Sequence, residues 1–321
     1  MQKHTRRSTR AAFAESTSKN LRSQWKSYLL FCFYFNLTPF PATSKVLAWF
    51  AQLLSRSMTA IDTVRNYISG VKLLHVLLDL SCDGFSGFEV KLAIRGLARL
   101  NPHKRRQPLP ITPAILYKIH AQLDFTVTED LVWWVVFLLS FFLMARKSNM
   151  VPNSVYSFDG NKQLLAEDIV VGHGSLLVHL KWSKTNQFGT RRLLIPLVRI
   201  PGSVLCPVRA VKLMRETIHF HPKAPAFAVP GRTGLVPLTY LGLTKKLRAV
   251  LNAAGLDASL YSSHSFRRGA ASYAFSVGVN PLLIQLQGDW VSDSYRRYLE
   301  FEVSKRASVS RQIRGAILKH V

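Results

Sequence analysis

One run of apolar residues limits what this chain can fold into. The fifteen residues from Leu131 to Ala145 read LVWWVVFLLSFFLMA and end directly before Arg146 and Lys147. A membrane-spanning helix needs about 20 apolar residues, so this run predicts a helix that is buried in a protein core. The chain therefore needs a domain built around residues 131–145. We expect a soluble, intracellular protein that has no membrane partner.

The N-terminal part of the chain carries a different pattern. Apolar residues recur every three or four positions, first between Leu21 and Cys32 and then in three further segments up to Leu100. This spacing predicts amphipathic helices. We therefore expect residues 17–101 to form a compact four-helix domain, preceded by a flexible basic N-terminus over residues 1–16.

A short segment separates this part from the rest. Residues 102–112 combine three prolines with the four polar and basic residues His103–Arg106. Prolines stiffen the segment and charge keeps it out of a core, so it predicts an interdomain linker. Its cluster Lys104, Arg105 and Arg106 either contacts DNA phosphates or serves as a nuclear address.

After the linker, strand patterns appear between helical ones. Residues 164–171, 175–182 and 191–196 alternate or carry β-branched side chains, which predicts a small antiparallel sheet. Helical patterns cover residues 113–123, 131–145, 206–220 and 239–254. The expected fold class is mainly α with a small antiparallel β-sheet. A mixed α+β domain would occupy residues 113–321 and end in a C-terminal helix.

The charge indicates a polyanionic partner. The chain has 43 basic and 17 acidic residues, a formal charge of +26, and the basic residues are spread along its length. This favours a folded surface that binds nucleic acid, although a basic protein with a solvated surface is the alternative. Lys72, Lys91, Arg95 and Arg99 either line a DNA-facing side of the helical domain or belong to a solvated face.

Metal chemistry has little support in the sequence. Cys32, Cys82 and Cys206 are too few and too scattered for a disulfide framework or a zinc cluster. His219 and His221 lack obvious partner ligands. We therefore expect neither a metal nor a cofactor.

An ordered set of side chains suited to a phosphate follows the apolar run. Its members are Arg146, Lys184, His264, Arg267, Trp290 and Tyr298. His264 and Arg267 are three residues apart, so on a helix they share a face and can point at one anion. Each motif alone is weak evidence for a phosphate site, and it is the ordered combination that indicates one. Glu167 or Asp168 either orients an arginine of this set or is a solvated strand end.

These motifs resemble those of tyrosine recombinases. M-A-R-K-S-N at 144–149 is similar to the first arginine box of that family, and W-S-K-T at 182–185 resembles its lysine hairpin. HSFRR at 264–268 resembles the second box, and the interval to Trp290 (290 − 264 = 26) is similar to that of the family. The last box, LIQLQGDWVSDSYRRYLEF, resembles the recombinases of DIRS-like, Ngaro and Crypton mobile elements. The N-terminal helices are similar to the family's core-binding domain.

The chain departs from the family pattern at three positions. Trp290 stands where histidine is frequent, and Asn149 replaces a frequent glutamate. Tyr298 follows Trp290 by eight residues (298 − 290 = 8), where many members have nine. Tyr295 is the alternative nucleophile. We prefer Tyr298, because the sequence Tyr-Leu-Glu-Phe resembles the residues that follow the family's nucleophile, and we expect Tyr295 to pack in the helix.

The resemblance implies a reaction. Tyr298 would attack a DNA phosphodiester and form a 3′-phosphotyrosyl link with a free 5′-hydroxyl. Arg146 and Arg267 would stabilise charge on the non-bridging oxygens. His264 would help to take the tyrosine proton and Lys184 would protonate the departing oxygen, while Trp290 offers one N–H donor and apolar surface.

The expected function is therefore site-specific cleavage and rejoining of double-stranded DNA during recombination or integration of a mobile element. The enzyme would act in the nucleus as a homo-oligomer, a tetramer on paired sites. Val309, Ile313 and Ile317 lie at helical spacing in the tail, which would dock either on a neighbouring protomer or on its own subunit. The alternatives are relaxation of DNA like a type IB topoisomerase, and a domesticated protein that only binds DNA.

Overall fold

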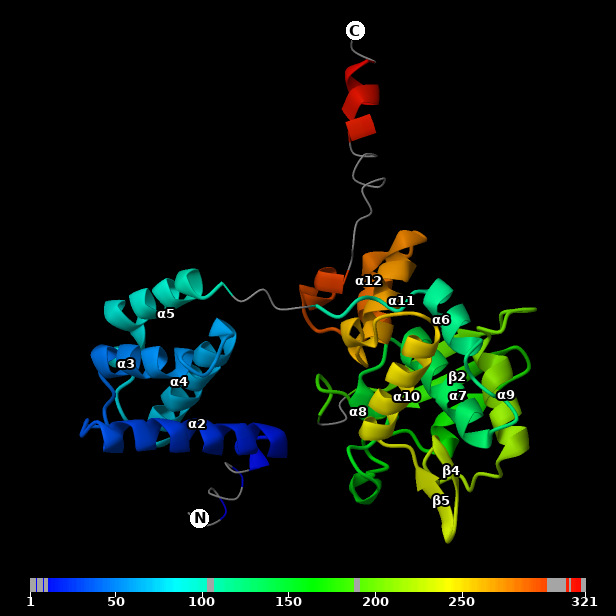
Figure 1. The fold of residues 1–321 in the computed structure, drawn as a ribbon, viewed down its shortest axis with the longest axis horizontal. Coiled ribbons are helices and arrows are strands. Elements are labelled where there is room, and N and C mark those ends of the chain that lie inside the picture. The colour runs from blue at the N-terminus through cyan, green and yellow to red at the C-terminus, as the bar shows by residue number, and fades with distance from the viewer. Residues whose placement is uncertain are drawn as a thin grey trace. The chain divides into compact units, whose positions relative to one another are not determined.

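The computed structural model describes residues 4, 8, 11–102, 107–187, 191–298, 310–311 and 313–318. The chain divides into two compact units, Met1–Arg106 and Gln107–Val321. Each unit has its own buried core. Figure 1 labels the elements of both units, which are described one at a time below.

The first unit is helical. Its elements are α2 (Glu15–Tyr34), α3 (Ser44–Ser55), α4 (Ile61–Leu77), the 3-10 turn η1 (Asp83–Ser86) and α5 (Phe88–Leu100). Tyr28, Leu47, Phe50, Val64 and Val71 are fully buried between the helices. The spacing of apolar residues had predicted these four helices, and the mainly α fold class is confirmed.

A buried histidine completes the core of the first unit. Nε2 of His75 accepts a hydrogen bond from the backbone N–H of Ala42 at 2.9 Å. Nδ1 must then carry the proton and donate it to the carbonyl oxygen of Val71, also at 2.9 Å. The ring lies edge-on against Phe40 and Phe85. His75 therefore has a structural role, because both ring nitrogens are satisfied inside the unit.

The second unit combines helices with two small sheets. Its helices are α6 (Pro113–His120), α7 (Thr128–Phe142), α8 (Lys147–Met150), α9 (Pro207–Thr217), α10 (Tyr240–Ala253), α11 (His264–Ser276) and α12 (Pro281–Gln287). One antiparallel sheet has the order β1 (Ile169–Val171), β2 (Ser175–Leu180), β3 (Leu193–Val198), and the other pairs β4 (Ala228–Gly231) with β5 (Gly234–Pro237). Short 3-10 turns are η2 (Val155–Ser157), η3 (Ala166–Asp168), η4 (Ala258–Leu260) and η5 (Asp293–Tyr298).

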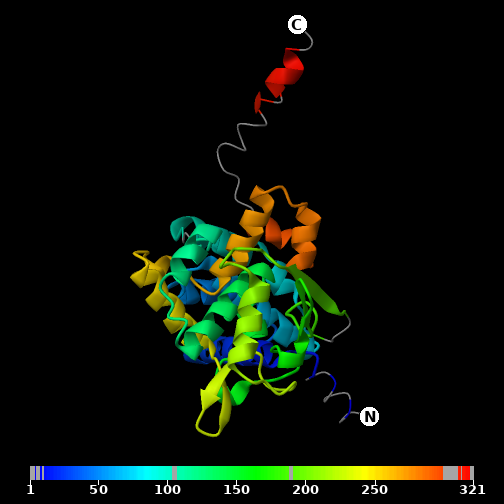
Figure 2. The same cartoon turned by 90° about the vertical axis from the view of Figure 1, so that its right-hand side faces the viewer.

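Helix α7 is the centre of this unit. All its residues from Asp130 to Phe141 are buried, and it packs against α9 and α11 (Figures 1 and 2). The prediction of a buried helix in the apolar run is thus confirmed. The helix ends at Phe142, earlier than the run itself, because the chain turns at Met144, whose φ is 47°. Among the described residues, no helix is both long and apolar enough to cross a membrane.

Parts of the second unit differ from the prediction. The first predicted strand, 164–171, is shortened to β1, because Ala166–Asp168 forms a 3-10 turn in which the Asp168 carboxylate accepts the Leu165 N–H at 2.7 Å. The β4–β5 hairpin, which extends from the body of the unit in both views, falls in a stretch predicted only to be rich in turns (Figures 1 and 2).

The structure describes only part of the predicted linker, Pro102 and residues 107–112. Ile111 is fully buried, its N–H donates to the Ser265 carbonyl at 3.0 Å, and the Leu109 N–H donates to Leu260 at 2.7 Å. Residues 107–112 therefore belong to the second unit. The predicted basic cluster, Lys104 to Arg106, lies outside the described residues, as do half of residues 1–16 and most of the C-terminal tail.

We predict that Gly269→Ala destabilises the second unit. Alanine usually stabilises a helix interior by about 1 kcal/mol relative to glycine. In α11, however, an added Cβ would lie 1.8 Å from the Ile111 carbonyl oxygen, and overpacking of this kind costs about 1–3 kcal/mol. Thermal unfolding of the full chain measures the difference.

Gly96→Ala in α5 is the matched control. An added Cβ at Gly96 meets no atom within 4 Å, so this variant should be as stable as the wild type or more so. Equal stability of the Gly269→Ala variant and the wild type would contradict the close packing of α11 on Ile111.

Candidate active site

Two arginines meet at the end of α7. Arg146 precedes the first residue of α8, and Arg267 lies in α11 with only 2 % of its surface exposed. Nη1 of Arg267 donates a hydrogen bond to the carbonyl oxygen of Met144. This bond ties α11 to the turn that carries Arg146. The two predicted arginines, 121 residues apart in the chain (267 − 146 = 121), are therefore brought together.

The environment of Arg267 is unfavourable for its own charge. Burial, followed by repulsion from Arg146, lowers the pKa of Arg267 from 12.5 to about 9. Burial also lowers the pKa of Arg146, against the favourable charge of Asp289. An anion placed between the two guanidinium groups would relieve both effects.

One donor of Arg267 has no partner. Its Nη2 atom is buried and makes no hydrogen bond within the described structure. A buried donor left unpaired costs about 1–3 kcal/mol, and such groups are rare in native proteins. The face of Trp290 lies 3.6 Å from the guanidinium carbon and supplies a cation–π contact. The arrangement suits a phosphate oxygen, which would accept the unused N–H.

Tyr298 lies in the same pocket. Its ring centre is 5.8 Å from that of Trp290, and its hydroxyl interacts electrostatically with both arginines. The Ser272 hydroxyl, on α11, donates to the backbone carbonyl of Tyr298. One subunit thus holds the tyrosine and the arginines together.

Tyr295, the alternative nucleophile, has a different environment. It is 2 % exposed and belongs to the core of the second unit, with its ring centre 6.2 Å from that of Trp290. The half-buried side chain of Tyr298 is more accessible than that of Tyr295. The geometry therefore favours Tyr298 as the nucleophile.

Lys184 lies in the loop that joins β2 to β3, and its side chain is exposed. The two residues that flank it, Ser183 and Thr185, both donate side-chain hydrogen bonds to Oδ2 of Asp289. The side-chain amide of Asn149 donates to the Trp182 carbonyl oxygen at 2.5 Å. These bonds attach the base of the lysine loop to the segments that carry Arg146 and Trp290.

Asp289 is a residue of the site that the sequence did not reveal. It is 7 % exposed, and its Oδ1 accepts from Arg191 at 2.9 Å while its Oδ2 lies 3.9 Å from Nη1 of Arg146. Burial would raise the pKa of Asp289, but the hydroxyls of Ser183 and Thr185 and the two guanidinium groups hold it below its usual value. The only signal in the sequence was its place between Gly288 and Trp290.

His264 is the first residue of α11 and is exposed, one helical turn before Arg267. Helical geometry places the two residues on the same side of the helix, as the spacing predicted. The backbone N–H of His264 donates to the Ser262 hydroxyl at 3.2 Å. A ligand that approaches Arg267 from solvent would pass this end of the helix.

The predicted DNA-binding residues of the first unit that the structure describes are exposed. Lys72 lies on α4, and Lys91, Arg95 and Arg99 lie on successive turns of one face of α5. Both a DNA-facing side and a solvated face have this exposure, so their role stays a prediction.

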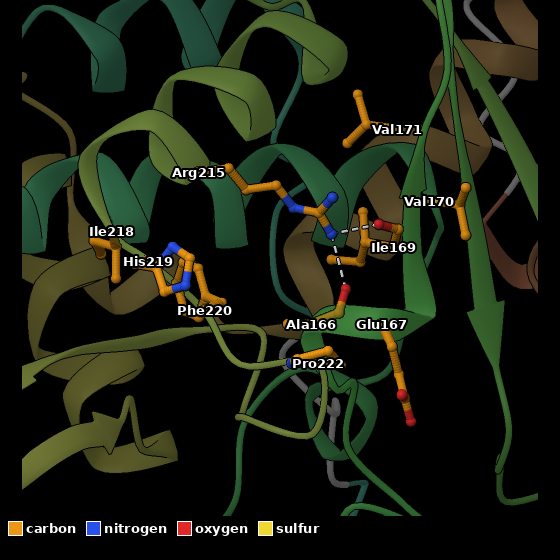
Figure 3. A pocket seen from close by; sticks show the side chains of 10 residues that line it. All are labelled: Ala166, Glu167, Ile169, Val170, Val171, Arg215, Ile218, His219, Phe220 and Pro222. Atoms are coloured by element: carbon orange, nitrogen blue, oxygen red, sulfur yellow. Dashed lines mark hydrogen bonds between the residues drawn. The ribbon is translucent and has the colours of Figure 1, made fainter.

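Neither Glu167 nor Asp168 orients an arginine of this site. The buried Asp168 carboxylate pairs with Lys181 at 2.6 Å. Glu167 instead lines a separate surface pocket of about 500 Å³ between β1 and the end of α9, shown in Figure 3. Arg215 closes one side of that pocket by donating to the carbonyl oxygens of Ala166 and Ile169. None of the six predicted catalytic residues lines it.

The two histidines that the sequence singled out have surroundings different from those of Arg146 and Arg267. His219 lines the pocket of Figure 3, and Nδ1 of His221 accepts the Lys223 N–H at 3.3 Å. In the part of the chain that the structure describes, no group of three or more His, Cys, Asp or Glu side chains could hold a metal ion.

Comparisons with known proteins bear on the fold. No protein-family model matches the chain. The integrase/recombinase xerD homolog of Selenomonas ruminantium is 24 % identical over 299 residues, which cover 89 % of this chain and 82 % of that protein. XerH site-specific recombinase, solved with palindromic difH substrate after cleavage, superposes with a TM-score of 0.55 at 13 % identity. The superposition covers 84 % of this chain and 69 % of the XerH chain.

Two further structures are similar. The lambda integrase dimer bound to a COC′ core site has a TM-score of 0.54 and 15 % identity, covering 93 % of this chain and 75 % of that one. The Tn1549 transposon integrase with circular-intermediate DNA has a TM-score of 0.53 and 12 % identity, covering 84 % and 86 %. The chain shares the fold of these proteins over most of its length.

We predict that sulfate stabilises the second unit by accepting the unpaired N–H of Arg267. A ligand at 100 times its dissociation constant adds about 2.7 kcal/mol to the stability of the folded state. The guanidinium is protonated below its pKa of about 9, so the effect should be full at pH 7 and decline as the pH rises above that value. Thermal unfolding at constant ionic strength measures it.

Sulfate also stabilises proteins by exclusion from their surfaces, so variants must separate the two effects. Arg267→Met should lose the specific part, whereas Arg95→Met, which removes an exposed arginine, should keep it. Equal sulfate responses of Arg267→Met and the wild type would rule out an anion site at Arg267.

Proposed function

We propose that this chain, which belongs to the tyrosine recombinase and integrase family, cleaves and rejoins DNA strands through a phosphotyrosyl intermediate. One observation carries the proposal. Arg146 and the buried Arg267 meet in one pocket, an N–H of Arg267 is left unpaired there, and the hydroxyl of Tyr298 lies within electrostatic range of both. Such a pocket has a place for a phosphate group and a nucleophile beside it.

The proposed reaction has two proton transfers and one displacement. The Tyr298 oxygen attacks phosphorus and its proton passes to His264, while the bond from phosphorus to the 5′ oxygen breaks. The ammonium group of Lys184 gives a proton to that leaving oxygen. Because the phosphotyrosyl bond keeps the energy of the broken one, a second 5′-hydroxyl can reverse the step and join a different strand.

Arg146 and Arg267 would stabilise the charge that gathers on the non-bridging oxygens during attack. Removing one such donor typically lowers the rate by on the order of 10²–10³. Trp290 has no proton to exchange at neutral pH, so its contribution would come from stacking on Arg267 and from excluding water beside Tyr298.

The natural setting is a further part of the proposal. The last sequence box resembles mobile-element recombinases, and the Tn1549 transposon integrase shares the fold, which supports a role in moving a genetic element. XerH and lambda integrase were solved on their DNA sites, which supports duplex DNA as partner.

We propose further that the protein works in the nucleus, with residues 103–106 as its address, and as a tetramer on paired sites. Ile313 and Ile317, 56 % and 58 % exposed, could make contacts between protomers.

We predict a covalent DNA adduct that depends on Tyr298. The probe is a nicked duplex carrying the DNA ends that flank this gene, placed so that the short strand with the new 5′-hydroxyl is lost after cleavage. Wild type should form an adduct that survives detergent, and Tyr298→Phe should form none. Tyr295→Phe is the matched control and should react.

The same assay separates the alternatives. An adduct that persists in Tyr298→Phe would contradict the nucleophile assignment. Relaxation of any supercoiled plasmid without paired sites would favour a topoisomerase activity, and binding without an adduct would favour a DNA-binding protein.

We also predict that the α5 residues contribute to DNA affinity through phosphates. If Lys91, Arg95 and Arg99 each contact one phosphate, changing all three to Gln should reduce the slope of log affinity against log salt by about 2.7, at about 0.9 per contact. Lys72→Gln tests the neighbouring helix separately. Unchanged slopes would identify both sets as a solvated face.

A further inference from the structure

We propose that Asp289 is a positioning residue that holds the β2–β3 loop so that Lys184 reaches the leaving 5′ oxygen. The proposal rests on the proposed function, because it assigns a role within that reaction. It concerns a residue to which the sequence motifs gave no role.

The contacts of Asp289 converge on the lysine loop from both sides. Oδ2 accepts the hydroxyls of Ser183 and Thr185, which precede and follow Lys184. Oδ1 accepts from Arg191 at 2.9 Å, on the returning side of the loop. One carboxylate therefore binds three residues of the segment that carries Lys184.

Polar contacts hold the described residues of the loop: those to Asp289, the bond from Asn149 to Trp182 at its base, and bonds within the loop such as that from Asn186 to Arg191. The register of the sheet ends at the pair Leu180 and Leu193, so the described loop residues 181–187, 191 and 192 lie beyond the last pairing of β2 with β3. A cavity of about 250 Å³ lies between this loop and α12, with Asp289 in its lining. Apolar packing is incomplete there, so polar contacts hold the loop.

A carboxylate beside a phosphate site requires a physical reason. Its negative charge repels the substrate, and its burial alone disfavours ionisation. Two neighbouring arginines offset these effects. Arg191 and Arg146 lie 2.9 Å and 3.9 Å from its oxygens, so the three groups together keep one positive charge. The backbone at Asp289 also has a φ of 52°, and such conformations persist where the surroundings enforce them.

Loss of the Asp289 anchor should impair one step of the reaction, the breaking of the bond between phosphorus and the 5′ oxygen. Without the anchor, the ammonium group of Lys184 would not be held near the 5′ oxygen, while the arginines that bind the other oxygens would remain. Loss of a positioned general acid slows a reaction by about 10²–10⁴-fold. We expect Asp289→Asn, which keeps the shape and removes the charge, to slow cleavage by on the order of 10²-fold.

A sulfur substitution at the 5′ bridging position isolates this step. The tyrosine oxygen again bonds to phosphorus and the tyrosine proton leaves to a base, but the bond that breaks is now phosphorus to sulfur. A thiol has a pKa of about 8.5, far below that of a hydroxyl group or water, so the sulfur departs as a thiolate without a proton from Lys184. The modified duplex therefore bypasses a misplaced acid.

The test compares cleavage rates of full-length variants on the two duplexes. Lys184→Ala and Asp289→Asn should both be slow on the oxygen duplex and recover most of their loss on the sulfur duplex. Arg267→Met should stay slow on both, because its defect is in charge stabilisation. A general folding defect would not distinguish the two duplexes.

Variants on the loop side make the test independent of the Asp289 charge. Ser183→Ala with Thr185→Val removes both hydroxyl donors and leaves the arginines paired. This variant should show the same recovery on sulfur, and adding Asp289→Asn should cause little further loss, because residues that act as one unit are not additive.

The outcomes distinguish the two proposals. If wild type forms no adduct on either duplex, the proposed function fails. If wild type reacts but Asp289→Asn and the loop variant remain equally slow on the sulfur duplex, the positioning role of Asp289 is wrong and the proposed function stands.

Discussion

The constraint on which the site depends is the confinement of two guanidinium groups inside one protein unit. Repulsion between like charges and loss of water oppose this arrangement, and each is worth up to a few kcal/mol, a large part of the roughly 5–15 kcal/mol by which a domain is stable. The buried α7 helix and the bond from Arg267 to the Met144 carbonyl hold the groups in place regardless. The two guanidinium groups therefore favour binding of an anion, which would accept the unpaired N–H of Arg267 and offset the repulsion between them.

Two neighbours of the arginines, Trp290 and Asp289, stabilise the guanidinium groups in different ways. Trp290 covers Arg267 with an aromatic face, which attracts a cation without adding a charge that would compete with phosphate. Asp289 does add a negative charge, and it faces Arg146 and Arg191 together with two hydroxyl groups of the lysine loop. This chain thus has a stacking indole beside Arg267, and a carboxylate lies directly before it in the sequence.

Sequence reasoning found the features that are encoded locally. The length and composition of the apolar run were enough to predict α7 as a core helix, and the motif order identified Arg146, Lys184, Arg267 and Tyr298. It could not find the role of Asp289, because the contacts with Ser183 and Thr185 join residues 106 and 104 positions apart. The 3-10 turn at Ala166–Asp168 was missed for a different, local reason: the β-branched residues 169–171 favour a strand, whereas the Asp168 carboxylate bonds to the Leu165 N–H and turns the chain.

The groups proposed to take part in the reaction differ in how they are held, and the difference matches the tasks proposed for them. The arginines follow or belong to helices packed in the apolar core, and Arg267 is almost wholly buried. Lys184 and Tyr298 lie instead on a loop and a short 3-10 turn attached by hydroxyl hydrogen bonds, from Ser183 and Thr185 in one case and from Ser272 in the other. Segments with few apolar contacts open at lower free energy than core helices. A phosphate would therefore meet a rigid pair of cations, while the groups proposed to exchange protons or to form the new bond would be able to adjust during the proposed reaction.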